Sequence, residues 1–99
     1  MNFELLISEE AALDIEDAFR WYQMQRDGLG KDFELCLEAG LNRILRNPKH
    51  FQKKYKIVRV HFIERFPYGI HYLTEERLIK VVGVFHTARN PKSWDERIK

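Results

Sequence analysis

The sequence predicts an α+β fold in which an N-terminal strand and an antiparallel helical hairpin pack on one face of a mainly antiparallel four-stranded sheet. Two observations support this fold. The first half of the chain carries apolar residues at helical spacing, whereas the second half contains three runs rich in Val, Ile, Phe and Tyr. Runs of helix and runs of strand are therefore segregated along the chain, which is typical of the α+β class.

The chain begins with a short predicted strand, residues 3–7, which is followed by the start signal of a helix. Ser8 is a favourable N-cap because its hydroxyl can accept a hydrogen bond from a backbone N–H of the first turn. Glu9 and Glu10 follow in that turn, where the helix dipole favours anions. The first helix is therefore predicted over residues 9 to 26.

The apolar positions of this helix form one stripe. Its members recur at spacings of three and four residues: Ala11, Ile15, Ala18 or Phe19, and Tyr22. Trp21 and Met24 lie off the stripe. Either the stripe is wide, or this flank of the helix contacts a partner.

A glycine-containing turn, Gly28-Leu29-Gly30, separates the first helix from a second one, which is predicted from about Lys31 to Arg46. Gly28 suits the left-handed conformation that ends many helices. Asn47-Pro48 stops the second helix. Gly40 lies inside it at a cost of about 1 kcal/mol relative to alanine, which predicts a close approach of the first helix at this point.

The connector that follows, residues 49–56, is basic and contains two aromatic residues. Lys53, Lys54 and Lys56 make it a candidate surface for a target or partner, because clustered lysines can face phosphate groups. The alternative is an ordinary solvated loop.

Three strands and two turns complete the predicted sheet. The strands cover residues 57–65, 68–74 and 78–85. Phe66-Pro67-Tyr68-Gly69 forms the first turn, because proline cannot donate a hydrogen bond to a strand ladder. Glu75-Glu76-Arg77 is a short polar break and forms the second turn.

Basic side chains of these strands suggest a possible chemistry. By the period of two, Arg59, His61 and Arg65 share one face of their strand, and Lys80 shares a parity with His86. If this face is open, Arg and Lys can stabilise charge on a phosphodiester while His transfers protons near neutral pH, as metal-independent RNA cleavage requires. The alternative is that these residues solvate the open face of a one-sided sheet.

Length and composition set limits on this account. Ninety-nine residues suit one domain, residues 1–99, and an apolar fraction of 44% is ordinary for a globular protein. The sequence has no apolar run long enough to span a membrane and no metal-ligand spacing or glycine-rich phosphate loop, so neither a metal nor a cofactor is expected. A lone Cys36 excludes an intrachain disulfide, which fits a reducing cytoplasm.

Charge is distributed unevenly. Residues 1–40 carry a net charge of −7, whereas residues 41–99 carry +9. This asymmetry suggests an acidic or nucleic-acid partner for the second half, or acidic helices that neutralise a basic sheet within one domain.

Motifs spread along the chain resemble the RelE/ParE toxin superfamily, from about residue 4 to residue 97. The residues that carry this resemblance are Trp21-Tyr22, Gly28-Leu29-Gly30, Phe33, Asn47-Pro48, Arg59, Arg65-Phe66-Pro67-Tyr68, Ile70, Tyr72, His86, Arg89, Pro91, Trp94 and Arg97. The Arg-Phe-Pro-Tyr turn and the segment from His86 to Pro91 are its most specific parts. The resemblance is closer to the ParE-like, plasmid-stabilisation type.

The resemblance implies a growth-inhibiting bacterial toxin, but the superfamily divides in mechanism. RelE-like members cut messenger RNA on the ribosome, whereas ParE-like members poison DNA gyrase. RelE-like enzymes place an Arg where this chain has Gly69, and a Tyr near the C-terminus where Trp94 stands. These departures favour the gyrase target and no enzymatic activity. Were the chain a nuclease, its candidate catalytic residues would be Arg59, Arg65, His86 and Arg89.

The resemblance also implies a cognate antitoxin as the partner, in a module without a membrane component. Antitoxin or target contacts are expected at Trp21, Met24, Lys53, Lys54, Lys56 and Trp94. The assembly is expected to be a homodimer or a toxin–antitoxin heterotetramer. A third alternative is an inactive module that has kept only antitoxin binding.

Overall fold

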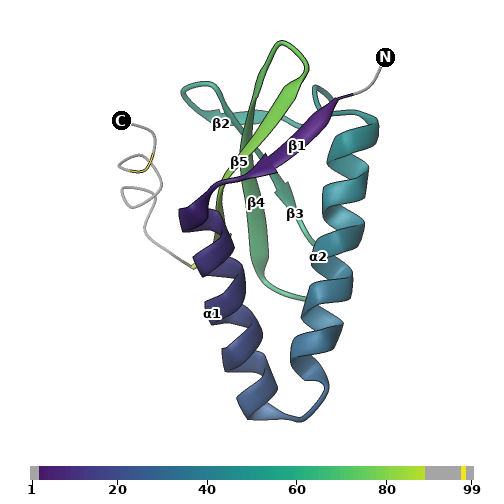
Figure 1. Ribbon diagram of the computed structural model, residues 1–99, viewed down its shortest axis with the longest axis vertical. Coiled ribbons are helices and arrows are strands. Elements are labelled where there is room, and N and C mark those ends of the chain that lie inside the picture. Colours follow the sequence, from purple (N-terminus) through teal and green to yellow (C-terminus); the bar gives the residue numbers. More distant parts are fainter. Residues whose placement is uncertain (1–2, 89–96, 98–99) are drawn as a thin grey trace.

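The computed structural model describes residues 3–88 and residue 97. Its elements are β1 (Glu4–Ile7), α1 (Glu9–Gln25), α2 (Leu29–Arg46), β2 (Lys53–Tyr55), β3 (Val58–Phe62), β4 (Tyr68–Glu75) and β5 (Leu78–His86). The strands form one sheet in the order β1-β5-β4-β3-β2, in which β1 pairs parallel with β5 and the other neighbours are antiparallel. Figure 1 shows both helices on the same side of the sheet. The predicted α+β class is therefore confirmed.

The sheet has five strands where the sequence predicted four. The additional strand, β2, is only three residues long and lies at the sheet edge, where Lys53 pairs with Arg59 and Tyr55 with Val58. Such a short, lysine-rich segment shows neither an apolar run nor a period of two. The pairing with β3 creates it, and a sequence pattern does not reveal that pairing.

Local signals at the helix ends agree with the structure. The Oγ atom of Ser8 accepts a hydrogen bond from the N–H of Ala11 at 3.0 Å, which confirms the predicted N-cap. Gly28 has a φ of +91° and precedes α2, as the turn required. The side-chain oxygen of Gln23 accepts hydrogen bonds from the N–H groups of Gly28 and Gly30, at 3.2 and 3.1 Å, and thereby ties the turn to α1.

The prediction that Gly40 lets the first helix approach the second was wrong. A Cβ atom at Gly40 would lie 3.0 Å from Ile63 and 3.1 Å from Ile70, so this glycine lets α2 approach the sheet. The close approach between the helices occurs at Gly30, where a Cβ atom would lie 2.8 Å from the backbone oxygen of Phe19. Periodicity alone identified a buried glycine but not the element that it faces.

The main core lies between the helices and the sheet. Its buried residues are Ala11, Ala18, Tyr22, Phe33, Leu37, Ile44, Ile63, Phe66, Ile70, Tyr72, Ile79, Val81 and Val84. At the end near the helical turn, rings of Tyr22, Phe33, Phe66 and Tyr68 pack together with centroid separations of 4.8 to 6.1 Å. This aromatic cluster fixes the start of β4 against both helices.

Candidate functional site

The basic face predicted for β3 does not lie open. Arg59 pairs with Tyr72 and His61 with Ile70, and both partners belong to the core beneath the helices. Because directly opposite residues of an antiparallel pair share a face, Arg59 and His61 also point toward the helix side. The predicted alternation is correct for Arg59 and His61, but the face assigned to it was wrong. Arg65 does not belong to it, because β3 ends at Phe62.

The contacts of Arg59 stabilise the fold. Its Nη1 atom donates hydrogen bonds to the backbone oxygens of Phe51 and Lys49, at 2.7 and 3.3 Å. These bonds hold the connector that follows α2 against β3. The guanidinium therefore orders the chain here.

His61 is also engaged in packing. Its ring lies 4.2 Å from the ring of Phe51, centroid to centroid, and its Nε2 atom is buried without a hydrogen-bond partner among the described residues. Burial, with a smaller contribution from Arg43, lowers the pKa of His61 below its usual value. The imidazole is thus held neutral against the helix side of the sheet.

The other described catalytic candidates are held by separate partners. Arg65 lies in the loop before β4 with a φ of +71°, and its Nη2 atom is 3.7 Å from a carboxylate oxygen of Asp32. His86 ends β5, where its ring is 5.3 Å from that of Tyr68. Among the described residues, no hydrogen bond, ion pair or ring contact joins any two of the side chains Arg59, Arg65 and His86. The predicted candidates Arg89 and Trp94 lie outside the described residues.

A β-bulge separates Lys80 from His86. On β5, Val81 pairs with Tyr72 and Gly83 pairs with His71, so one extra residue of β5 stands between these pairs. Lys80 therefore faces away from the helices, where its Nζ atom is 3.2 Å from Glu75, whereas His86 faces toward them. The predicted common face of these two side chains was wrong because the bulge reverses the alternation.

The sheet face away from the helices, here called the distal face, is mostly apolar. A row of side chains crosses it from β2 to β5 and on to Arg97. The Tyr55 hydroxyl lies 3.0 Å from Nδ1 of His71, the ring of His71 is 4.8 Å from that of Phe85, and the guanidinium of Arg97 lies 4.7 Å from the Phe85 centroid. Burial, with a smaller contribution from Arg97, lowers the pKa of His71 to about 4. The distal face therefore carries a neutral histidine where the sequence suggested a cationic surface.

Cationic side chains gather instead at one edge of the sheet. Lys53, Lys54 and Lys56 are all exposed on β2 and the turn after it. Between Glu38 and Glu64 the sequence contains no acidic residue. The connector thus presents the positive surface that the sequence predicted, at the opposite edge of the sheet from β1.

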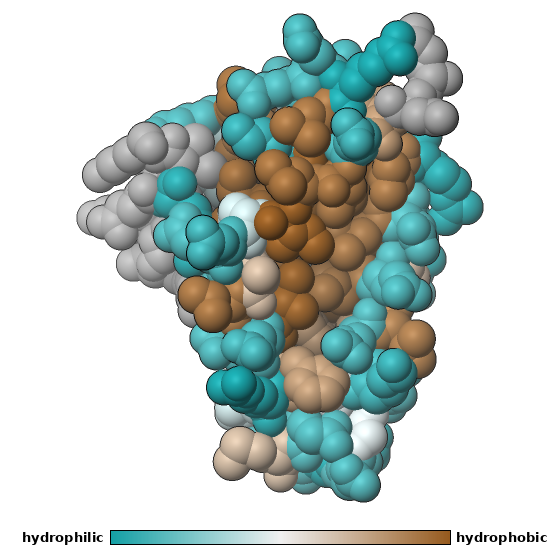
Figure 2. Space-filling model, in the orientation of Figure 1, coloured by the Kyte–Doolittle hydropathy of each residue, from teal (hydrophilic) through white to brown (hydrophobic). Residues whose placement is uncertain are grey.

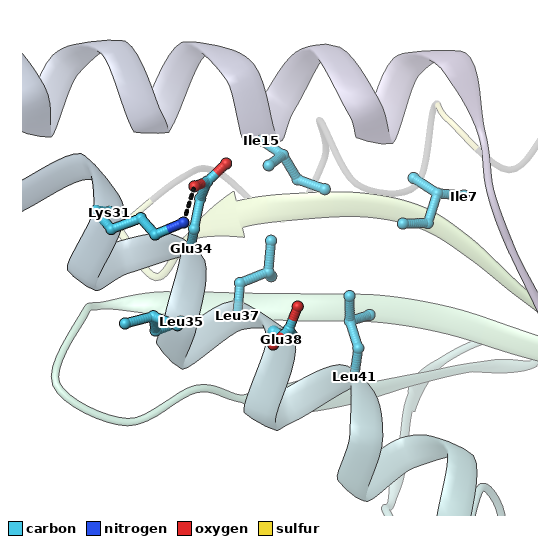
Figure 3. A pocket seen from close by; sticks show the side chains of 8 residues that line it. All are labelled: Ile7, Ile15, Lys31, Glu34, Leu35, Leu37, Glu38 and Leu41. Carbon is cyan, nitrogen blue, oxygen red and sulfur yellow. Dashed lines mark ion pairs between the residues drawn. The ribbon is translucent and has the colours of Figure 1, made fainter.

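An apolar groove runs between the two helices. Figure 2 shows a continuous hydrophobic surface there, and Figure 1 shows that the two helices diverge from the turn that joins them. A hollow of about 320 Å³ within it is lined by Ile7, Ile15, Leu35, Leu37, Leu41, Lys31, Glu34 and Glu38. Ile15 of α1 and Leu37 and Leu41 of α2 point into the same space (Figure 3). Sequence reasoning missed this groove because it assigned both helical stripes entirely to the core.

The exposed flank of α1 carries a second hollow. Trp21 and Met24 are exposed, as their position off the apolar stripe suggested. Trp21 lines a cleft of about 480 Å³ together with Tyr22, Pro67, Tyr68 and His86, here called the aromatic cleft. This cleft brings together residues from α1, the loop before β4, and the ends of β4 and β5.

The described part of the chain lacks two further features. Within it, His, Cys, Asp and Glu side chains form no group of three or more that could hold a metal ion. No helix there is long and apolar enough to cross a lipid bilayer.

Comparisons with known proteins found a matching family model and structures of similar fold. The family model described as "ParE toxin of type II toxin-antitoxin system, parDE" matches residues 5–91. A solved structure described as "Chromosomal ParDE TA system from P. aeruginosa" is similar in fold, with a TM-score of 0.76 and 12% sequence identity over 85% of this chain and 95% of that chain. No curated protein sequence matches the chain significantly.

Proposed function

This chain belongs to the ParE toxin family of type II toxin–antitoxin systems, and we propose that it inhibits growth by poisoning DNA gyrase in the cytoplasm until a cognate antitoxin neutralises it. The family match over residues 5–91 is the observation that carries this proposal. The ParE-like fold supports it.

The alternative mechanism, ribosome-dependent RNA cleavage, has less support from the site. RelE-like nucleases resemble this chain but carry an Arg at the position of Gly69. Here a Cβ atom at Gly69 would lie 3.0 Å from Val60 and 3.2 Å from the ring of Phe62. An arginine at this position therefore requires these neighbours to move. Arg59 and His61 are also committed to packing on the helix side. We therefore favour a protein target over an RNA substrate.

The apolar groove between α1 and α2 is the antitoxin site that we propose. A type II antitoxin must cover its toxin with a segment of its own chain, and an amphipathic helix or extended segment can place alternate apolar side chains into such a groove. Glu34, which is 4.0 Å from Lys31, and Glu38 both line the groove. Glu38 and the strongly acidic sequence of the hairpin favour a segment that flanks its apolar residues with Lys or Arg.

Leu35→Glu should weaken antitoxin binding about tenfold, because it places a charge on the rim of the apolar groove where the partner must be desolvated. Leu35 is 54% exposed, so the fold should tolerate the change. Leu13→Glu is the matched control, since Leu13 is 58% exposed on α1 and does not line the groove. Titration calorimetry with the antitoxin measures both variants. Equal weakening by the two would place the antitoxin elsewhere.

Growth of a bacterial host tests the toxin assignment itself. Expression of the chain alone should stop growth, and co-expression of the antitoxin encoded beside it should restore growth. Unimpaired growth with the chain accumulating as folded protein would support the third alternative, an inactive module that binds antitoxin.

A further inference from the structure

The aromatic cleft is lined by side chains that can bind a cation. Trp21, Tyr22 and Tyr68 line it, and π faces attract cations within about 6 Å of a ring centroid. The cleft shares Trp21, Tyr68 and His86 with a neighbouring hollow of about 230 Å³, which is also lined by Asp14 and Asp17. Aromatic rings and carboxylates thus meet along one flank of α1, on the side away from the apolar groove.

The two carboxylates of this flank differ in their engagement. Asp14 accepts hydrogen bonds from the N–H of Val84 and from Arg97. Asp17, three residues later and four before Trp21, makes no hydrogen bond or ion pair with any described residue. Residues 9–21, which cover all sides of α1, carry five acids and one base, so this helix as a whole attracts cations.

His86 adds an imidazole ring to the wall of the cleft. Its Nδ1 atom accepts a hydrogen bond from the N–H of Ala88 at 3.0 Å. This bond and the contact with the Tyr68 ring fix the imidazole in place.

The same molecule already holds two arginines by an aromatic ring and an aspartate. The guanidinium of Arg97 lies 4.7 Å from the Phe85 centroid and 2.7 Å from Asp14. That of Arg65 lies 5.6 Å from the Phe66 centroid and 3.7 Å from Asp32. Trp21 and Asp17 repeat this pairing of ring and carboxylate beside an open cleft.

We propose that the aromatic cleft binds an arginine side chain of the protein on which the toxin acts, with the guanidinium over Trp21 and paired with Asp17. Arginine fits better than lysine, because a planar guanidinium stacks on rings and donates to a carboxylate through two N–H groups. Assigning the arginine to the target rests on the proposed function, whereas guanidinium binding itself does not. The cleft lies on the flank of α1 away from the antitoxin groove, so the two occupants use different surfaces.

A small-molecule titration tests the cleft directly. The full chain carrying Trp94→Phe retains Trp21 as its one tryptophan, so its fluorescence reports on the cleft. N-acetyl-arginine amide should change this fluorescence saturably, with a dissociation constant in the millimolar range, and N-acetyl-lysine amide should bind roughly threefold more weakly. Absence of saturable binding, or equal binding of both probes, would overturn the inference.

Matched variants locate the binding. Asp17→Asn should weaken arginine-amide binding about fivefold, because the ion pair is lost, whereas Glu16→Gln should leave it unchanged. Glu16 is an exposed neighbour of Asp17 on the same helix, and it lines neither the aromatic cleft nor the neighbouring hollow. Its change to glutamine removes the same charge. Equal effects of the two variants would reduce the binding to general electrostatic attraction and contradict a built site.

Growth assays then test whether the bound arginine belongs to the protein on which the toxin acts. Asp17→Asn should relieve growth inhibition while antitoxin affinity stays within about twofold of that of the unchanged chain, because the groove is untouched. If the variant stays fully toxic, or loses antitoxin binding instead, the arginine does not belong to the target. If the unchanged chain is not toxic, the proposed function fails, and the titration still decides whether the cleft binds guanidinium.

Discussion

Replacing Asp14 with alanine should lower the free energy of unfolding by about 3 kcal/mol, because it removes the nearest anion of a largely buried guanidinium and the acceptor of a backbone N–H. Asp14 and Arg97 expose only 13% and 16% of their side chains, and the Nη1–Oδ2 distance is 2.7 Å. The same carboxylate accepts the N–H of Val84 at 3.0 Å, beyond the point where β1 stops pairing with β5. Asp14 thus completes the edge of the sheet and anchors Arg97 there.

Chemical denaturation of four variants, Asp14→Ala, Arg97→Ala, the double variant and Glu10→Ala, measures this contribution. Glu10→Ala is the control, because Glu10 also approaches Arg97, at 3.7 Å, but exposes 67% of its side chain and should cost less than about 1 kcal/mol. Asp14→Ala combined with Arg97→Ala should cost less than the sum of the two single changes, because the double variant leaves no unpaired charge. An Asp14→Ala variant as stable as the Glu10→Ala variant would show that the pair contributes little.

Acidification should destabilise the fold through His71. Its usual pKa of 6.5 falls to about 4 in the folded state. Between these values the unfolded state binds the proton and the folded state does not, so stability is full above pH 6.5 and falls as the pH approaches 4. At pH 5 the loss attributable to His71 should be about 2 kcal/mol.

The contribution of His71 can be isolated from unfolding curves of the unchanged chain and of His71→Gln, each recorded at pH 7 and pH 5. Glutamine keeps a hydrogen-bond acceptor for the Tyr55 hydroxyl but does not titrate. The variant should therefore lose about 2 kcal/mol less than the unchanged chain over this interval. His61, whose pKa is also lowered, is present in both proteins, so its contribution cancels. Identical pH dependence of the two proteins would mean that folding does not lower the pKa of His71.

Much of the fold could be predicted because the relevant signals are local. Ser8 marks the start of α1, Gly28 the turn, and Glu75-Glu76-Arg77 the hairpin between β4 and β5. The structure contains all three, although Glu75 is still part of β4. The exposed flank at Trp21 also followed from helical spacing, because a residue off the apolar stripe faces solvent or a partner.

The faces of the sheet could not be predicted in the same way. Val60 and Phe85 are buried on the distal face, and Ile70 is buried beneath the helices, so apolar residues do not distinguish the two sides. The bulge on β5 then reverses the alternation before His86. The apolar groove and the aromatic cleft could not be predicted either. Their presence depends on the distance between packed elements, and the spacing of residues in the sequence does not indicate that distance.

The most direct test of the proposed function combines purified toxin with two reactions in parallel. In one, DNA gyrase acts on plasmid DNA. In the other, ribosomes translate a defined messenger RNA. Gel analysis of both nucleic acids should show gyrase–DNA cleavage complexes that accumulate with toxin concentration while the messenger RNA stays intact, and the antitoxin should abolish the effect. Ribosome-dependent cuts in the messenger RNA with unaffected gyrase would contradict the account and make this chain a nuclease.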